Sequence, residues 1–131
     1  MKIKLMKVYV DDQERALRFY TDVLGFMVTA DYSQGGFRWL TVASPEEPEG
    51  TALQLALNDN AAAKAYQQAM FEQGQPAAMF FTDDIEGDHE RLAGRGAAFT
   101  LPPTKVTGST IAMVNDTCGN LLQLSQLTWQ G

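Results

Sequence analysis

The chain has 131 residues, a length that fits one domain or two modules of about sixty residues each. Its composition, 45% hydrophobic and 20% charged, is that of a globular protein. Sixteen acidic against ten basic residues give a net charge of -6, which argues against nucleic acid as a partner. One cysteine, Cys118, excludes an internal disulfide, and one histidine, His89, excludes a metal site built from several histidines.

The N-terminus gives no sign of export or membrane insertion. It alternates lysines with apolar residues and lacks the continuous apolar core of a signal peptide. No apolar run approaches the ~20 residues that a membrane helix needs. We therefore expect a cytoplasmic protein with no membrane partner.

The first part of the chain predicts a strand, a helix and three more strands. Apolar alternation indicates a strand over residues 3–10. Asp11-Asp12 then offers an N-cap, and an apolar stripe at helical spacing leads from Ala16 to Gly25, which ends the helix. The three strands are expected at 26–31, 37–43 and 51–57, with Gly- and Pro-rich turns between them.

The pattern then begins again after a second helix. That helix, capped by Asn58-Asp59-Asn60, is expected from Ala61 to about Gln73 and closes at Gly74. Asp83-Asp84 offers the N-cap of a third helix. The expected elements of this second part are a strand at 77–82, a helix from 85 that ends at 94–96, and strands at 97–101, 105–114 and 120–127.

The two parts also align in sequence. Val8-Tyr9-Val10-Asp11-Asp12 matches Phe80-Phe81-Thr82-Asp83-Asp84, and Leu24-Gly25-Phe26 matches Arg95-Gly96-Ala97 after a one-residue slip. One strand–helix–strand–strand–strand module cannot bury both faces of its sheet, so two copies are needed. We expect an α+β fold of tandem βαβββ modules whose curved sheet surrounds a concave pocket. The predicted single domain, 1–131, consists of module 1–57, bridging helix 58–75 and module 76–131.

Two segments resemble a known family. Val10–Phe26, VDDQERALRFYTDVLGF, is similar to its opening strand and helix, and Asn115–Leu124, NDTCGNLLQL, to its closing turn and strand. The chain thereby resembles the vicinal oxygen chelate superfamily, which contains glyoxalase I, bleomycin-resistance proteins and extradiol dioxygenases. The resemblance extends over nearly the whole chain and implies the same tandem fold.

The resemblance also locates the positions where metal-dependent members carry four ligands. These positions are Leu5, Gln54, Ala77 and Gln123 in this sequence. Leu5 and Ala77 have no donor atom, and the two glutamines offer only neutral amide oxygens, whereas a divalent ion in such a site needs carboxylate or imidazole donors. We therefore expect no metal and no other cofactor.

Strand alternation separates the residues expected under the helices from those expected in the pocket. The first set is Met6, Val8, Val10, Leu53, Leu55, Leu57, Leu122 and Leu124. The second set is Leu5, Lys7, Tyr9, Gln54, Ala77, Leu121 and Gln123, joined by Trp39 if Leu40 and Val42 face the helix.

Several of these residues leave two interpretations open. Gln54 and Gln123 can hydrogen-bond a ligand, or instead bond each other, water or Lys7. Lys7 can bind an anionic group or stay solvated, and Trp39 can stack on a ligand or fill the core.

Three other residues of functional type are expected to have structural roles. We expect Arg38 at the surface and His89 partly buried on its helix. Cys118 is expected to be an unreactive turn residue because no basic neighbour lowers the pKa of its thiol.

The predicted function is that of a glyoxalase/bleomycin-resistance-like protein that binds or sequesters a small organic molecule without a metal. The alternative is a lyase or isomerase that acts on a small carbonyl or thioester substrate through Lys7, Tyr9 or the glutamines. A structural or regulatory protein remains a third possibility if side chains fill the pocket. We further expect a homodimer, with the modules paired either within or between chains.

Overall fold

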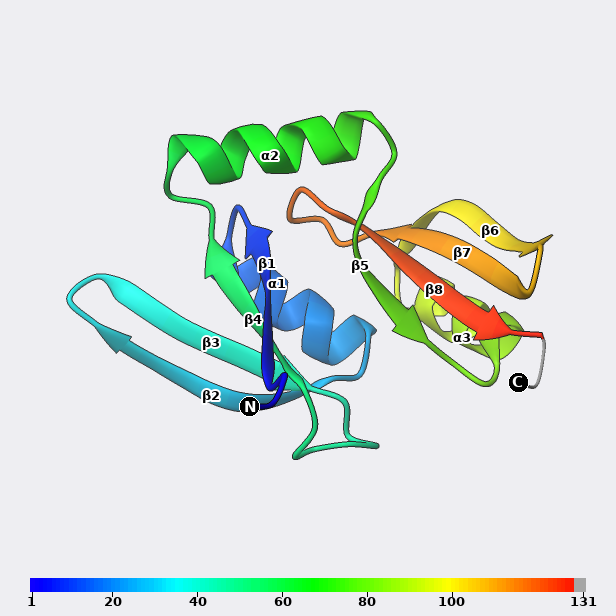
Figure 1. The fold of residues 1–131 in the computed structure, drawn as a ribbon, viewed down its shortest axis with the longest axis horizontal. Coiled ribbons are helices and arrows are strands. Elements are labelled where there is room, and N and C mark those ends of the chain that lie inside the picture. Colours follow the sequence, from blue (N-terminus) through cyan, green and yellow to red (C-terminus); the bar gives the residue numbers. More distant parts are fainter. Residues whose placement is uncertain (129–131) are drawn as a thin grey trace. The chain divides into compact units, whose positions relative to one another are not determined.

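The computed structural model describes residues 1–128, which divide into two compact units. The first unit is Met1–Tyr66, and the second begins at Gln67. Each unit contains one four-stranded sheet, and helix α2 (Ala61–Glu72) carries the chain from the first unit into the second (Figure 1). The predicted α+β fold with one βαβββ module in each part is confirmed.

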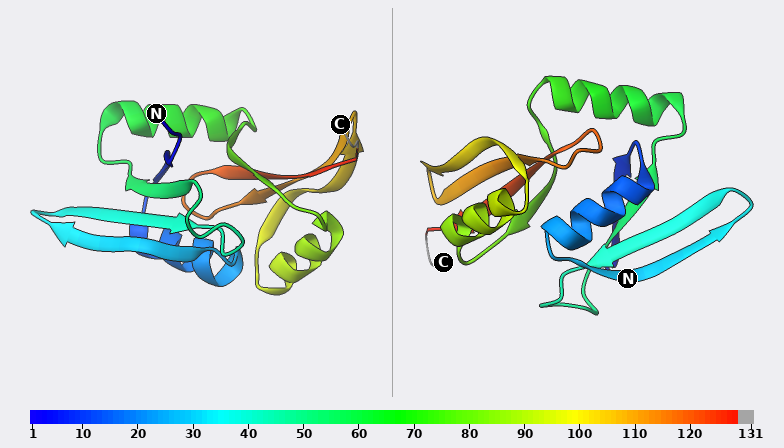
Figure 2. Two further views of the ribbon diagram at one scale, coloured as in Figure 1. Left: turned by 60° about the horizontal axis from the view of Figure 1, so that its bottom comes forward. Right: turned by 180° about the vertical axis from the view of Figure 1, so that it is seen from behind.

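The first unit is a sheet with one helical segment against it. Its elements are β1 (Leu5–Val10), α1 (Gln13–Arg18), the π-helical turn η1 (Phe19–Val23), β2 (Met27–Gln34), β3 (Phe37–Ala43) and β4 (Ala52–Leu57). The strand order is β1-β4-β3-β2, in which β1 runs parallel to β4 and the other pairs are antiparallel. Figure 2 shows α1 against one face of this sheet.

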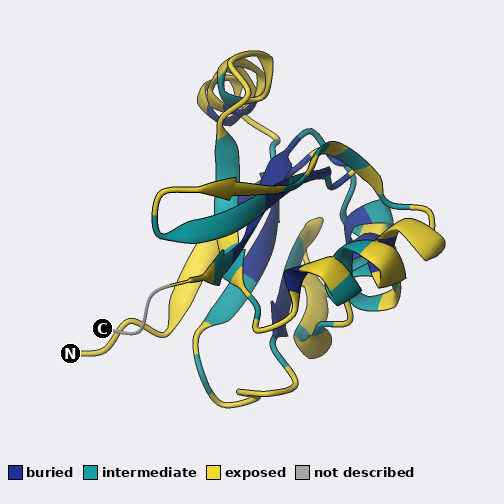
Figure 3. Cartoon of the chain, turned by 90° about the vertical axis from the view of Figure 1, so that its right-hand side faces the viewer, coloured by how far each residue is buried: buried dark blue, intermediate teal, exposed yellow. Residues whose placement is uncertain are grey.

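The core of the first unit lies between that helical segment and the sheet. The strand residues that point toward the helical segment are buried, and Figure 3 draws the buried parts of the chain in dark blue. The buried residues of the two layers are Val8, Val10, Leu40, Val42 and Leu55 from the sheet and Ala16, Phe19 and Tyr20 from the helical segment. Burial of this apolar surface is the main stabilising term for the unit.

The predicted helix-facing set is confirmed in part. In the first unit Val8, Val10 and Leu55 are buried, but Met6 is 57% exposed and Leu57 is also exposed. Met6 lies near the start of β1, which is an edge strand with a neighbour on one side only. Leu57 is the last residue of β4, where the sheet ends.

The second unit repeats the first. Its elements are β5 (Pro76–Phe81), α3 (Ile85–Gly94), β6 (Ala98–Val106), β7 (Ser109–Asn115) and β8 (Leu121–Leu127). The strand order β5-β8-β7-β6 and the single parallel pair, β5 with β8, match the first unit. In both units an aspartate caps the helix: Asp12 accepts from the Arg15 N–H and Asp84 from the Gly87 N–H, each at 3.0 Å.

The one-residue slip between the repeats has a structural cause. Asp12 and Gly25 are thirteen positions apart, whereas Asp84 and Gly96 are twelve apart. The first helix absorbs the additional residue in its π-helical turn, where the Leu24 N–H donates to the Phe19 carbonyl at 3.0 Å, five residues back. Both helices then end at a glycine with positive φ.

One expected strand is wrong. The stretch 105–114 is not a continuous strand, because the chain reverses between Val106 and Ser109, which pair with each other across the turn. Gly108 takes a φ of 81°, which allows the reversal. The β-branched residues on both sides of this turn produce a strand-like pattern that hides it.

A buried polar cluster attaches the second half of α2 to the rest of the second unit. Gln67 donates to the Cys118 carbonyl at 2.7 Å and to Oδ1 of Asn120 at 3.3 Å. Asp116, fully buried, accepts from the N–H groups of Cys118 and Asn120 at 2.7 and 2.9 Å. Cys118 is itself fully buried in this turn, in line with its expected structural role.

The histidine also has the environment that the sequence predicts. His89 is half-buried on α3, and its ring packs edge-to-face on Phe99 with 4.5 Å between the ring centroids.

Within residues 1–128, no helix has the length and apolar character needed to cross a membrane.

Candidate ligand pocket

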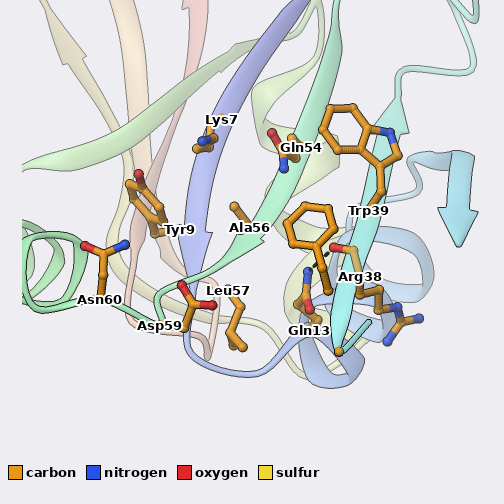
Figure 4. A pocket seen from close by; sticks show the side chains of 12 residues that line it. Lys7, Tyr9, Gln13, Arg38, Trp39, Gln54, Ala56, Leu57, Asp59 and Asn60 are labelled. Atoms are coloured by element: carbon orange, nitrogen blue, oxygen red, sulfur yellow. Dashed lines mark hydrogen bonds between the residues drawn. The ribbon is translucent and has the colours of Figure 1, made fainter. Parts of the chain in front are cut away.

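A cavity of about 290 Å³ lies in the first unit. Its volume is close to the lower end of the about 300–1,000 Å³ typical of small-molecule sites. The pocket is formed by β1, β3, β4, the turn before β3, the first residue of α1 and the turn after β4 (Figure 4). Its lining residues are Lys7, Tyr9, Gln13, Gly36, Phe37, Arg38, Trp39, Gln54, Ala56, Leu57, Asp59 and Asn60.

The strand register explains why residues distant in sequence meet here. Lys7 is opposite Gln54, and Tyr9 is opposite Ala56, on the parallel pair β1 and β4. Paired residues of adjacent strands point to the same face of the sheet. These side chains alternate with the buried core residues, so they lie on the face opposite α1.

Four of the predicted pocket residues, Lys7, Tyr9, Trp39 and Gln54, line this cavity. Leu5 does not, although it belongs to the same strand; it lies at the exposed start of β1.

Two further predicted residues belong to the second unit. Ala77 lies on β5 at a register irregularity next to Pro76. Gln123 lies on β8 opposite Met79, and its amide donates to Oγ of Ser125 at 3.1 Å. The assignment of Ala77 and Gln123 to a pocket stays a prediction.

Gln54 is the most unusual polar residue of the cavity. It is only 5% exposed, yet its amide makes no hydrogen bond with any other residue in the described part of the chain. In that part of the chain, every side-chain nitrogen or oxygen that is sealed from solvent has a hydrogen-bond partner. Since the Gln54 amide has no such partner, its atoms are not sealed and open onto the cavity. A buried amide normally has its partners supplied by protein or ordered water.

A cation and two aromatic rings lie on the same wall. The Lys7 ammonium is 5.6 Å from the centroid of the Tyr9 ring, and Lys7 makes no ion pair within residues 1–128. Trp39 is half-buried on the pocket side. Leu40 and Val42, one and three residues further along the strand, point to the other face and pack against the helix. The sequence left that choice of face open.

Arg38 contributes to the pocket without offering it a charge. Its guanidinium hydrogen-bonds both carboxylate oxygens of Asp31 at 2.9 Å and Oε1 of Glu14 at 2.7 Å, and Figure 4 shows the side chain directed away from the cavity. The hydrogen bonds from Arg38 hold the pKa of Asp31 below its usual value. Arg38 thus lies at the surface, but its side chain is only 20% exposed and joins α1 to β2 and β3.

Gln13 is a pocket residue that the sequence did not single out. Its side-chain amide nitrogen donates to the backbone carbonyls of Arg38, at 3.1 Å, and Leu55, at 2.8 Å. The amide therefore ties α1 to the backbone of β3 and β4. Its position directly after the N-cap Asp12 was the available signal, because side chains of the first helical turn can reach the ends of adjacent strands.

Strand alternation also indicates Phe37 and Ala56, which share a face with Trp39 and Gln54. For Asp59 and Asn60 the sequence predicts only a helix-capping role. Asn60 has both roles, since its Oδ1 accepts from the Ala63 N–H at 2.8 Å while the residue lines the pocket.

The donor set does not fit a divalent metal ion. In the part of the chain that the structure describes, no three His, Cys, Asp or Glu side chains are grouped so that they could hold one. The cavity itself offers one carboxylate, Asp59, alongside the amides of Gln13, Gln54 and Asn60 and the ammonium of Lys7. The ammonium group of Lys7, which lies opposite Gln54 on the pocket wall, would repel a metal cation bound to the Gln54 amide.

Comparison with known proteins gives the same family as the sequence motifs. Residues 2–124 match the Glyoxalase/Bleomycin resistance protein/Dioxygenase superfamily, and the chain belongs to that superfamily. It is 47% identical to the uncharacterized protein YurT of Bacillus subtilis (strain 168), over 96% of this chain and 99% of YurT.

Solved structures support the fold over nearly the whole chain. The crystal structure of UcmS2 shares 28% identity and a TM-score of 0.83, covering 95% of this chain and 97% of UcmS2. TnmS3, described as an antibiotic binding protein from Streptomyces sp. CB03234, shares 30% identity and a TM-score of 0.75, covering 98% and 97% of the two chains.

Proposed function

We propose that this protein binds, and thereby sequesters, a small organic molecule in the pocket of the first unit without help from a metal. The observation that carries the proposal is Gln54, whose amide is buried, unpartnered within the described residues and open to the cavity. Because these amide atoms open onto the cavity, they are free to hydrogen-bond a ligand there, in place of the water that can otherwise reach them.

The pocket wall indicates what kind of molecule fits. Trp39 and Tyr9 offer flat apolar surfaces, and Lys7 and Gln54 offer hydrogen-bond donors beside them. A flat, partly aromatic ligand that carries an acidic or carbonyl group would use both. The similarity to TnmS3, an antibiotic binding protein, supports a binding role of this kind.

A fluorescence titration tests the proposal. The chain has two tryptophans, and Trp129→Phe leaves Trp39 as the only one. We expect 2-hydroxy-1,4-naphthoquinone, which is flat, acidic and a contact quencher of indole, to quench the Trp39 emission with saturation. Lys7→Met and Gln54→Leu should each weaken that binding. Quenching that does not saturate, or that neither substitution changes, would contradict the proposal.

The protein is further proposed to be a homodimer. The edge strand β1 and the residues before it expose apolar side chains, among them Ile3 and Met6, which a second copy would cover. Light scattering should give twice the chain mass of 14.4 kDa at micromolar concentration. A mass of one chain across that range would refute the dimer and leave the binding proposal standing.

A further inference from the structure

Two charges of opposite sign line the pocket, and no oppositely charged side chain within residues 1–128 pairs with either of them. Lys7 and Asp59 both line the cavity, and within residues 1–128 neither makes an ion pair. The guanidinium of Arg38, by contrast, is already bound by Asp31 and Glu14. The charges available to a ligand are therefore one ammonium and one carboxylate.

These two charges lie at opposite ends of the pocket. The strands β1 and β4 run parallel, with Lys7 and Gln54 at the same level and Asp59 beyond the end of β4. Figure 4 shows Lys7 and Gln54 at one end of the cavity and Asp59 at the other. At ~3.3 Å per residue, the strand alone covers ~10 Å between Gln54 and Leu57, about the length of two fused aromatic rings with a substituent at each end.

The amides reinforce this polarity. At the Asp59 end, both N–H groups of Gln13 have backbone carbonyls as partners, so this side chain can offer a ligand only its oxygen. Gln13 and Asp59 are both acceptors, and they favour a donor such as a protonated amine. At the other end, the Lys7 ammonium favours an anion, and the amide of Gln54 can donate to the same group.

We infer that the ligand is a flat zwitterion of about two-ring length, with its anionic group at Lys7 and Gln54 and its protonated amine at Asp59 and Gln13. This inference rests on the proposed binding function and adds the charge and the orientation of the ligand. Trp39 and Tyr9 contact the rings between the two charged groups.

Four related probes test the inference by equilibrium dialysis at low salt. They are 6-(aminomethyl)-2-naphthoic acid, with both charges, 2-naphthoic acid, 2-naphthylmethylamine, and uncharged 2-methylnaphthalene. One partly exposed ion pair is worth up to about fivefold in affinity, so we expect the zwitterion to bind about threefold or more tighter than either singly charged probe.

Two substitutions assign each charge to its end of the pocket. Asp59→Asn should remove the gain from the aminomethyl group and keep the gain from the carboxylate, and Lys7→Met should do the reverse. Matched controls are Asp22→Asn and Lys105→Met, which make the same charge changes at exposed positions outside the pocket lining, and they should leave all four affinities unchanged.

The outcomes separate the two proposals. If all four probes bind with equal affinity, or if Asp59→Asn weakens the naphthoate and not the amine, the zwitterion inference is wrong while the binding function stands. If no probe binds, and 2-hydroxy-1,4-naphthoquinone also fails to quench Trp39, the pocket function falls and the inference falls with it.

Discussion

Lys7 and Gln54 lie opposite each other on the parallel strands β1 and β4, and both face the same cavity. Among the described residues the ammonium of Lys7 has no carboxylate partner and the amide of Gln54 has no hydrogen bond. Both residues belong to the sheet, so the pairing of the two strands fixes the spacing of their Cβ atoms. The register therefore puts one ammonium-bearing and one amide-bearing side chain on the same wall of the pocket.

Trp39 should supply the stacking part of the affinity. An aromatic pair is worth about 0.5–1.5 kcal/mol beyond its buried area, so Trp39→Leu should weaken the binding of 2-hydroxy-1,4-naphthoquinone by about two- to thirteenfold. Equilibrium dialysis measures this directly. Phe81→Leu, at an exposed position outside the pocket lining, serves as the control and should bind like the parent; an unchanged affinity in Trp39→Leu would place the ligand elsewhere.

The ion pair between Arg38 and Asp31 should make stability depend on pH. Arg38 lowers the pKa of Asp31 in the folded protein. At pH values around the folded and unfolded pKa of Asp31, the folded state therefore binds fewer protons than the unfolded state. The stabilisation is therefore complete above the unfolded pKa of ~4 and is lost as the pH falls through the lower, folded pKa. Urea denaturation from pH 6 down to acid should show this loss.

Asp31→Asn provides the comparison for that pH series. The variant should be less stable near neutral pH, and its stability should fall less steeply on acidification. Asp22→Asn, a change at an exposed carboxylate without an ion pair in the described structure, should keep the slope of the parent. Equal slopes for Asp31→Asn and the parent would show that the ion pair contributes nothing.

Gly119 should be intolerant of any side chain. Its φ is 97°, and an added Cβ would lie 2.5 Å from Nε2 of Gln67, which is held by its hydrogen bonds to the turn. Gly119→Ala should lower the unfolding free energy by at least ~1–3 kcal/mol, the cost of backbone strain at such a position. Gly94→Ala, on α3 with open space around it, should instead stabilise by about 0.5–1 kcal/mol.

Metal ions should have no specific effect on this protein. A metal held by the folded state raises the melting temperature by mass action, and a chelator reverses the rise. We expect neither Ni²⁺ nor Zn²⁺ to shift the melting temperature, and EDTA to leave that of the purified protein unchanged. A saturable rise with either ion would mean that the donor set has been misjudged.

The repeat was predictable because its signals are local. The aspartate caps and the closing glycines recur at nearly equal spacing, and they fix the helices of both units. The hairpin turn at Thr107-Gly108 was missed because its strand-forming neighbours outweigh one glycine. The π-helical turn was visible only as a slip of one residue between the repeats.

The pocket was predictable only where strand alternation governs it. Alternation correctly placed Lys7, Tyr9 and Gln54 on one face, since the pleat fixes the direction of each side chain. The sequence did not predict Gln13 as a pocket residue, because its position depends on how the helix packs across the ends of the strands. The pairing of Arg38 with Asp31 and Glu14 also depends on tertiary packing and has no local signature.

The pocket proposal makes Gln54 a residue kept for a ligand rather than for stability. Gln67 is the matched comparison: it is 6% exposed against 5% for Gln54, but it is hydrogen-bonded to the turn of the second unit. Denaturation measurements on Gln54→Leu and Gln67→Leu, together with 2-hydroxy-1,4-naphthoquinone binding by the folded variants, separate the two roles.

The most direct measurement is therefore this paired comparison. Gln67→Leu should lose about 1–3 kcal/mol of unfolding free energy, because the Cys118 carbonyl is left without its donor, and should keep its affinity for the naphthoquinone. Gln54→Leu should stay within about 0.5 kcal/mol of the parent and lose most of its affinity. The reverse pattern, in which Gln54→Leu is destabilised and binds the naphthoquinone as the parent does, would contradict the account.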